Sequence, residues 1–449
     1  MASSGRKRRR KKNKKNKRLL FGIEMVILAV LTVVLLGSIW VTHKFSLLNH
    51  QDLDDDKVFT ADELNKNQGN GESENGLEGV ELIALVGLDT RGEYTGQNSD
   101  TMIIACINHN DKTIKLVSLY RDTLLNISYP DEEPQYTKAN AAYAQGGPEQ
   151  MLTMMNTNLD LNITHYLTVD FMAVAKVVDA LGGLDVDMTR EEAIHLNNYN
   201  VETAEACGVE YEELELPSKD VFDGAITQTF HLNGSQAVSY ARIRKTAGND
   251  FRRTARQRKI LELIFEKAKT ADLGTLDSIM NQVFPLVTTD LSNTKILSLI
   301  QPLLSYTITS EQGFPFHQYS GSSITEVTGV DCVLPVTLEY NVKELHELLF
   351  PGESYTPSQT VVERSDYLIN LTGYGESDIP DVQSDVDLPP SLSYEEAEQQ
   401  GLLDNSDDDY YGDDYSDAAY YGEEDSYDDE GYSDDYYDSD YYDQEGYGW

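Results

Sequence analysis

An arginine-rich segment, residues 240–257, concentrates positive charge in a chain whose formal net charge is −42. It reads Tyr-Ala-Arg-Ile-Arg-Lys-Thr-Ala-Gly-Asn-Asp-Phe-Arg-Arg-Thr-Ala-Arg-Gln and contains one acidic residue, Asp250. A guanidinium group carries a fixed fork of N–H donors that matches two phosphate oxygens at once. A local concentration of arginine in an acidic protein therefore predicts a site for a phosphate or pyrophosphate anion.

The spacing within this segment indicates how its side chains converge. Arg242 and Arg244 are two residues apart, so in an extended chain they point to the same side. Arg253, Arg256 and Gln257 share one face of a helix, and the free backbone N–H groups of a first helical turn also attract anions. The alternative is a solvated basic helix start that binds no ligand.

Charged residues flank three predicted strands. Residues 81–87, 101–107 and 113–119 are apolar runs joined by polar loops, which favours an antiparallel meander. Asp89 follows the first strand, Asp100 precedes the second and Arg121 follows the third. We therefore expect these three side chains to meet at one edge of a sheet. The alternative is that the loops carry solvated charge only.

The elements after the meander indicate an α/β fold. Residues 149–158 predict a helix whose methionines belong to the core, and residues 165–169 and 184–188 predict strands around an apolar helix at 171–181. Strands that alternate with helices argue for a central sheet with helices on its faces. Residues 256–269 continue the arginine segment as a helix, whereas the acidic stretch 189–230 predicts an irregular insertion.

Charge and motif content exclude several functional classes. Outside the two tails the chain is strongly acidic, and DNA binding needs a broad basic surface, so nucleic acid is not an expected partner. The sequence contains no P-loop, no Gly-x-Ser-x-Gly elbow and no His-Glu-x-x-His motif. Its three cysteines, Cys106, Cys207 and Cys332, lack metal-like spacing.

An apolar run at residues 19–42 predicts a single membrane-spanning helix. At about 1.5 Å per residue this run can cross a hydrocarbon core of about 30 Å. Residues 1–18 hold eleven Lys and Arg and no acid, and such a positive flank stays in the cytoplasm, so the rest of the chain is expected outside the cell. A cleavable signal peptide is the alternative, although residues 40–43 lack the small residues of a cleavage site.

Composition predicts the remaining boundaries. Residues 43–79 are polar and rich in Asn and Gly, which predicts a linker between the membrane and a folded extracellular domain at 80–375. Residues 376–449 predict a disordered tail. From residue 404 onwards this tail holds nineteen Asp and Glu, twelve Tyr and no Lys or Arg, so no aliphatic core is available and like charges repel.

Six motifs, in this order and spacing, resemble those of the LytR–CpsA–Psr family of bacterial cell-envelope proteins. They span about residues 80–270 and are Val86-Gly-Leu-Asp-Thr-Arg91, Ser99-Asp-Thr-Met102, Ser118-Leu-Tyr-Arg-Asp-Thr123, Lys138-Ala-Asn-Ala-Ala-Tyr-Ala144 with Gly146 and Gly147, Ala180-Leu-Gly-Gly183, and Tyr240-Ala-Arg-Ile-Arg244 through Asp250-Phe-Arg-Arg-Thr-Ala-Arg-Gln257. The predicted membrane anchor fits the same family.

The resemblance implies a central mixed β-sheet flanked by helices, in an α-β-α arrangement. It implies an enzyme of the bacterial envelope that moves a glycopolymer, such as teichoic acid or capsule, from a polyprenyl pyrophosphate carrier in the membrane lipid to peptidoglycan. The bond formed is a phosphodiester.

The resemblance also implies the residues of the site. Asp89 and Asp100 would hold magnesium or another divalent cation, Asp250 would be a further carboxylate of the catalytic site, and either Asp89 or Asp250 would act as the base. The groups expected to bind pyrophosphate are Arg91, Arg121, Lys138, Arg242, Arg244, Arg253, Arg256 and Gln257. Of these, Arg121, Arg242 and Arg244 are also expected to act in catalysis.

Two positions depart from the family pattern. Asn98 stands two residues before Asp100, where the family usually has arginine, and Tyr120 replaces a frequent proline before Arg121. Asn98 removes one phosphate donor and keeps two alternatives open: a non-catalytic envelope regulator or scaffold that binds lipid pyrophosphates, and a prenyl pyrophosphatase.

Overall fold

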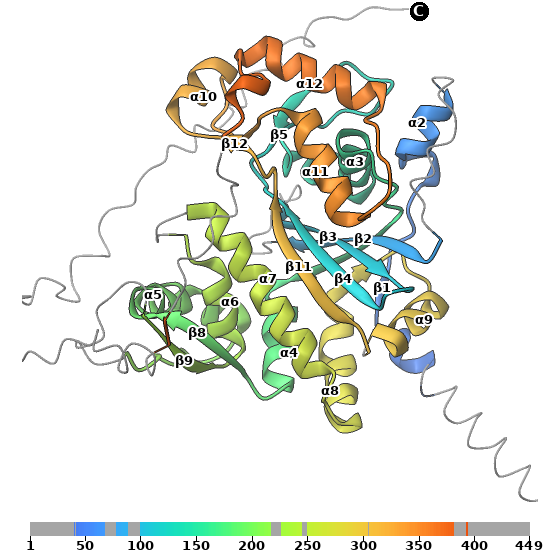
Figure 1. Ribbon diagram of the computed structural model, residues 1–449. Helices are drawn as coiled ribbons and strands as arrows, with labels where there is room; N and C mark the ends of the chain where they lie inside the picture. Colours follow the sequence, from blue (N-terminus) through green and yellow to red (C-terminus); the bar gives the residue numbers. More distant parts are fainter. Residues whose placement is uncertain are drawn as a thin grey trace, which may run out of the picture. The chain divides into compact units, whose positions relative to one another are not determined.

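The fold is built on a seven-stranded mixed sheet with the order β1-β10-β7-β2-β3-β4-β11 (Figure 1). The structure, a computed structural model, describes residues 40, 42–67, 78–88, 99–216, 226–244, 249–303, 305–380 and 392–393. All of them belong to the first of the two units into which the chain divides, residues 1–403. The tail from residue 404 lies outside the described residues.

The predicted meander forms the middle of this sheet. Strands β2 (Val80–Leu88), β3 (Ser99–Asn108) and β4 (Thr113–Leu119) pair antiparallel, as their short connections indicated. Two parallel neighbours flank them, β7 (His165–Asp170) beside β2 and β11 (Thr307–Phe314) beside β4. The short strands β10 (Val287–Thr289) and β1 (Asn49–His50) complete the sheet beyond β7.

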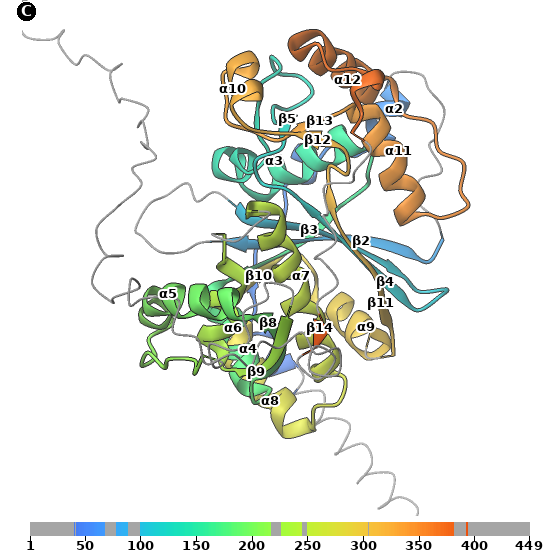
Figure 2. The same cartoon turned by 60° about the vertical axis from the view of Figure 1, so that its left-hand side comes forward.

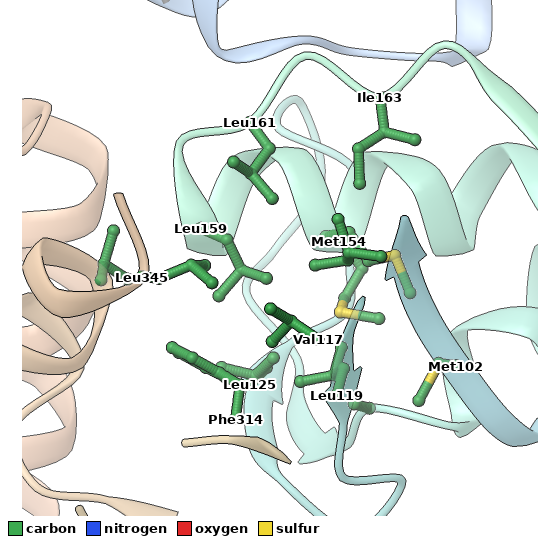
Figure 3. Packing of buried hydrophobic residues seen from close by; sticks show 14 of the residues in the cluster. Met102, Val117, Leu119, Leu125, Met154, Leu159, Leu161, Ile163, Phe314 and Leu345 are labelled. Carbon is green, nitrogen blue, oxygen red and sulfur yellow. The ribbon is translucent and has the colours of Figure 1, made fainter. Parts of the chain in front are cut away.

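One face of the sheet is covered by α3 (Ala141–Leu159), α11 (Leu338–Leu349) and α12 (Gln359–Thr372). Alternate strand residues such as Val86 and Ile104 point to this side, where they meet the methionines of α3. Met154 is fully buried there among Leu159 and Val117 (Figure 3), so the prediction that these methionines belong to the core is confirmed.

The other face is covered by α7 (Asn249–Ala268) and α9 (Asn293–Leu303). Ile83 and Ile103, one residue out of phase with the first set, pack there against Leu299 and Phe265. The strands therefore read as continuous apolar runs because both of their faces are buried. The prediction of a central mixed sheet flanked by helices, in an α-β-α arrangement, is confirmed.

A smaller sheet lies beside this core and carries its own helices. Its strands are β8 (Leu184–Thr189), β9 (Ile226–Leu232) and β14 (Leu392–Ser393), with α4 (Phe171–Ala180), α5 (Arg190–Cys207) and α6 (Gly234–Arg242) packed around them. The prediction of an irregular insertion over 189–230 is wrong at its start, where α5 forms, and at its end, where β9 begins. Helix α5 begins with a capping box between Thr189 and Glu192, and its buried face mixes polar with apolar residues, so its apolar periodicity is weak.

Short elements complete the described chain. They are η1 (Asp55–Lys57), α2 (Ala61–Asn67), β5 (Leu124–Asn126), β6 (Tyr136–Lys138), α8 (Leu273–Val283), η2 (Phe284–Leu286), β12 (Gln318–Tyr319), α10 (Ser322–Thr328), β13 (Leu334–Pro335) and η3 (Glu376–Asp378). Figures 1 and 2 both place α10 and α12 at one end of this unit and α8 at the opposite end.

The two ends of the domain differ from the sequence prediction. Residues 43–67, expected in a linker, contain β1 and α2 and pack on the fold, with Phe45 and Leu48 buried. On the C-terminal side, η3 and β14 fall within the predicted tail. Within the described residues, no helix combines the length and apolar character of a membrane span, and the predicted span at 19–42 lies almost wholly outside them.

Candidate functional site

The meander brings Asp100 and Arg121 together, as predicted. Asp100 is the second residue of β3 and Arg121 lies two residues beyond β4, at the same end of the sheet. The Nη1 atom of Arg121 donates a hydrogen bond to Oδ1 of Asp100 at 2.7 Å, and both side chains are about one-fifth exposed. Asp89 and Arg91, the other charged residues expected at this edge, lie outside the described residues.

Asp122 and Lys138 extend this pair into a cluster. Arg121 Nε lies 3.5 Å from Oδ2 of Asp122, and Lys138 Nζ lies 3.4 Å from the other oxygen of the same carboxylate. Lys138 is the last residue of β6, whose pairing with β5 places it opposite Leu124. Sequence reasoning included Lys138 but gave Asp122 no role, although its position directly after Arg121 in a motif was an available signal.

Helix α7 adds Arg253 to the same cluster. Arg253 is buried, and its Nη2 atom donates a hydrogen bond of 3.4 Å to the backbone oxygen of Asp100. Phe251, in the first turn of α7, makes an edge-to-face contact with Tyr120 at a centroid distance of 4.8 Å. Because Tyr120 directly precedes Arg121, this aromatic pair fixes the start of α7 beside the end of β4.

Arg256 is also buried, and a buried carboxylate holds it. Its Nε and Nη2 atoms both lie 2.9 Å from Oε1 of Glu192, and its Nη1 atom donates to the backbone oxygen of Ile243 at 2.9 Å. These contacts occupy the donor fork that was expected to bind pyrophosphate. The arrangement favours a role in which Arg256 joins α7 to α5 and to the segment around Ile243.

The contacts of Gln257 differ from those of Arg256. Its side-chain oxygen is buried and has no hydrogen-bond partner among the described residues. It follows Arg256 on α7, on the helix face that Arg253 begins.

Arg242 and Arg244 are placed differently from the prediction. Arg242 is the last residue of helix α6, so the extended conformation expected for this pair is wrong. Its Nη1 atom donates to Thr203 Oγ1 at 2.6 Å, and its guanidinium lies 5.4 Å from the ring of Phe171. Arg244 follows two residues later and is partly buried.

Helix α7 connects this arginine pair to the cluster. Arg253 contacts Asp100, and one turn later Arg256 contacts Ile243, the residue between Arg242 and Arg244. Asp250 is the second residue of α7, but its side chain is not among those described.

The charge balance of the cluster suits an anion. The described residues contribute two carboxylates, Asp100 and Asp122, and three cations, Arg121, Lys138 and Arg253. The carboxylates hold the Arg121 guanidinium from two sides, so its orientation is set without a ligand. The arrangement can bind and orient a phosphorylated group.

The cysteines of this region are not candidate nucleophiles. Burial raises the pKa of Cys207, near Arg242, and of Cys332, near Lys138. Burial also raises the pKa of Cys106 to about 11. A thiol whose pKa is raised stays protonated at neutral pH and is a poor nucleophile.

Comparison with known proteins identifies a matching family and several relatives of the chain. The sequence model of the LytR–CpsA–Psr family matches residues 48–341. The "polyisoprenyl-teichoic acid–peptidoglycan teichoic acid transferase" TagV of Bacillus subtilis is 29% identical over 211 residues, which are 46% of this chain and 49% of TagV. The enzyme of the same description from Enterococcus faecalis, TagU, is 32% identical over 214 residues, 47% of this chain and 61% of TagU.

The chain thus spans about half to three-fifths of the length of these curated relatives. Among solved structures, a Streptococcus agalactiae protein is 24% identical with a TM-score of 0.51, and the match covers 65% of this chain and 94% of that one. This likeness supports the fold.

Proposed function

The chain belongs to the LytR–CpsA–Psr family, and from this membership we propose that it is a membrane-anchored phosphotransferase. It moves a glycopolymer from a polyprenyl pyrophosphate carrier to a hydroxyl group of peptidoglycan and forms a phosphodiester. The names of the two curated relatives support this reaction and favour teichoic acid as the polymer.

The observation that carries the proposal is the cluster of Asp100, Arg121, Asp122, Lys138 and Arg253. Phosphoryl transfer depends on positioning and charge stabilisation more than on covalent chemistry by the protein. Arg121, Lys138 and Arg253 supply cations from a strand end, a hairpin and a helix start, so they surround one location. Such an arrangement stabilises the charge on a pyrophosphate better than the same side chains in water.

Each charged residue of the site has a separate role in this reaction. Arg121 and Arg253 orient the phosphates, and Lys138 adds a point charge. Arg242 and Arg244 bind the leaving part of the pyrophosphate from the α6 side. A carboxylate, Asp89 or Asp250, takes the proton from the acceptor hydroxyl while the oxygen attacks the phosphorus atom and the prenyl phosphate leaves.

A divalent cation fits the chemistry of these donors. Magnesium prefers oxygen ligands and is usually held by one or two carboxylates together with phosphate oxygens of the substrate. Asp100 is a carboxylate at the cluster, and no group of three or more His, Cys, Asp or Glu side chains within the described residues forms a complete protein cage. Asp89 and Asp100 would hold the ion, which when bound neutralises charge on the pyrophosphate.

The proposed location is the bacterial cell membrane. The apolar run 19–42 anchors the chain as a single span, with residues 1–18 in the cytoplasm and the domain outside. This topology places the cluster on the side of the membrane where peptidoglycan lies. Membrane lipid, the prenyl-linked glycopolymer and peptidoglycan are then the three partners.

The test is a transfer assay with the full chain in lipid nanodiscs, a prenyl-pyrophosphate-linked glycan, peptidoglycan and Mg²⁺. We expect labelled glycan on peptidoglycan, with loss of at least about 100-fold in Arg253→Gln, as is typical when one donor to developing charge is removed. Lys259→Gln, on the exposed face of the same helix, is the matched control and should keep full activity. Phosphate release that needs no acceptor would instead indicate a pyrophosphatase, and binding without turnover would indicate a scaffold.

A further inference from the structure

The segment that follows the predicted membrane span is fixed to the folded domain. Lys44 is buried, and its Nζ atom lies 2.5 Å from Asp277 and donates to Asn281 at 2.6 Å, both on α8. Phe45, the next residue, packs on Phe284 with ring centroids 5.7 Å apart. A buried ammonium group is unfavourable unless it is paired, so the carboxylate and amide partners of Lys44 make this a specific attachment of the segment to α8.

Backbone pairing continues this attachment. Strand β1 pairs in parallel with β10, with Asn49 opposite Thr288 and His50 opposite Thr289. Gln51 donates its backbone N–H to the oxygen of Thr289 at 3.0 Å. From residue 44 to residue 51 the chain is therefore part of the domain, and no free linker separates this domain from the apolar run that ends at residue 42.

Two large apolar side chains remain exposed at this attachment. The Trp40 ring is 47% exposed and lies with its centroid 5.5 Å from Lys44 Nζ. Leu273, the first residue of α8, is 84% exposed. Leu273 and Asp277 are four residues apart on α8 and share one face, and Trp40 also donates a hydrogen bond to Asp277. We call Trp40, Lys44, Leu273 and Asp277 the α8 face.

We propose that the α8 face rests on the outer surface of the lipid bilayer, with Trp40 and Leu273 inserted among the lipid headgroups. The proposal rests on the predicted membrane span at 19–42. That apolar run reaches the domain directly at Trp40, and tryptophan is the residue enriched where a span leaves the hydrocarbon core. A bilayer surface also removes water from Leu273, which no other part of the described chain covers.

The chemistry of the face indicates how it binds. Its carboxylate, Asp277, is paired with Lys44, and Asp272 caps α8 next to Leu273, so the face has no excess of positive charge. The contact is therefore apolar insertion, and we expect it to depend little on ionic strength, unlike the binding of a polybasic surface. The contacts of Lys44 with Asp277 and Asn281, which we call the Lys44 clamp, fix the orientation of the domain against the membrane that holds the prenyl tail of its carrier.

Fluorescence can test this placement because the chain has two tryptophans, Trp40 and Trp449. The full chain is reconstituted in phosphatidylcholine vesicles with or without acyl-brominated lipid, always with Trp449→Phe. Native Trp40 reports on the anchor. Leu273→Trp with Trp40→Phe reports on the α8 face, and Val327→Trp with Trp40→Phe is the control, since Val327 is 45% exposed on α10 at the opposite end of the unit.

We expect brominated lipid to quench the Leu273→Trp reporter at least twofold more than the Val327→Trp reporter, at both low and high salt. Equal quenching of these two reporters, with Trp40 still quenched, would overturn the proposal and leave the anchor intact. If Trp40 itself is not quenched, the anchor fails and the proposal with it. The nanodisc transfer assay described above is scored separately, by the labelled glycan found on peptidoglycan, so either failure can be told apart from failure of the enzymatic function.

The role of the Lys44 clamp is tested in the protein that carries the Leu273→Trp reporter. Lys44→Ala removes the buried ammonium, so we expect quenching by brominated lipid to fall. Lys57→Ala, which removes an exposed lysine of the same N-terminal region that pairs with the exposed Asp54, should leave quenching unchanged. Equal quenching in the two variants would show that Lys44 does not orient the domain and would overturn that part of the proposal.

Discussion

Replacing Arg256 with methionine separates two roles that sequence and structure assign to this residue. The resemblance to the family implies that Arg256 binds pyrophosphate. In the structure its three guanidinium nitrogens face Glu192 and the backbone oxygen of Ile243, with 1% of the side chain exposed. The structure therefore predicts that Arg256→Met primarily destabilises the fold and only secondarily affects ligand binding.

The size of this effect follows from burial. Removing one partner of a buried ion pair leaves an uncompensated charge, here Glu192, and costs about 3–5 kcal/mol. At roughly 2 °C per kcal/mol or slightly more for a domain of this size, the unfolding midpoint should fall by about 6–12 °C. The Glu192 side chain is only 11% exposed, so water cannot readily replace the lost arginine.

Thermal unfolding of the full chain in detergent, followed by circular dichroism, measures this change. Replacing both partners, as in Glu192→Gln with Arg256→Met, should recover most of the loss, because the neutral amide leaves no buried charge and its oxygen can still accept the backbone N–H of Thr189 that caps α5. The double variant should also recover glycan transfer. The reasoning is refuted if Arg256→Met unfolds within about 1 °C of the parent yet no longer binds prenyl pyrophosphate, or if the stable double variant remains inactive.

Three further predictions concern other parts of the fold and site. A Cβ atom at Gly313 would lie 2.0 Å from the Tyr120 hydroxyl, so Gly313→Ala should cost about 1–3 kcal/mol in thermal unfolding, whereas Gly375→Ala, with open space around it, should cost little. Burial lowers the pKa of His346 below its ordinary value of 6.5. As the pH falls, the imidazole is therefore protonated in the unfolded chain before it is protonated in the folded chain. Stability should therefore fall as pH drops below about 6.5, and His346→Gln should flatten that dependence between pH 7.5 and 5.5. Arg244→Ala should abolish glycan transfer without lowering the unfolding midpoint, and Arg244→Lys should rescue transfer poorly because a point charge cannot replace a guanidinium fork.

The sequence predicted those parts of the fold whose buried faces are apolar. Strands β2, β3 and β4 alternate Ile, Leu and Val between two covered faces, and their short connections determine an antiparallel order. That order alone places Asp100 beside Arg121, so one contact of the site could be predicted without any coordinates.

Helix α5 shows why other parts could not be predicted. Its buried face carries Glu192, Asn197 and Asn200, which bond to Arg256 and to backbone groups of the 212–214 segment. Apolar periodicity is the signal that identifies a helix in sequence, and this helix weakens the signal because it buries several hydrogen-bonding groups among its few apolar residues. The partners that satisfy these groups lie 12 to 64 residues away along the chain, where local patterns give no information.

The N-terminal segment was missed for a related reason. Residues 43–67 are polar in composition, and composition was the basis for predicting a linker. A few residues fix this segment, namely Lys44, Phe45 and Leu48, which contact α8 and the residues around β10. The few buried contacts that these residues make with distant parts of the chain are enough to hold the segment on the domain, although most of its residues are polar.

Tyr120 shows how a departure from the family pattern is accommodated within the site. A proline at this position would lack the N–H that donates to Phe314 at 2.9 Å and the ring that meets Phe251. Gly313, on the neighbouring strand β11, leaves the space that the tyrosine ring needs.

The substitution therefore strengthens the connection between β4 and the start of α7. Because Arg121 follows Tyr120 and Arg253 lies two residues beyond Phe251, both guanidinium groups depend on this aromatic pair for their approach to Asp100. The positions of the two arginines are then coupled, and a change at Tyr120 should affect both together.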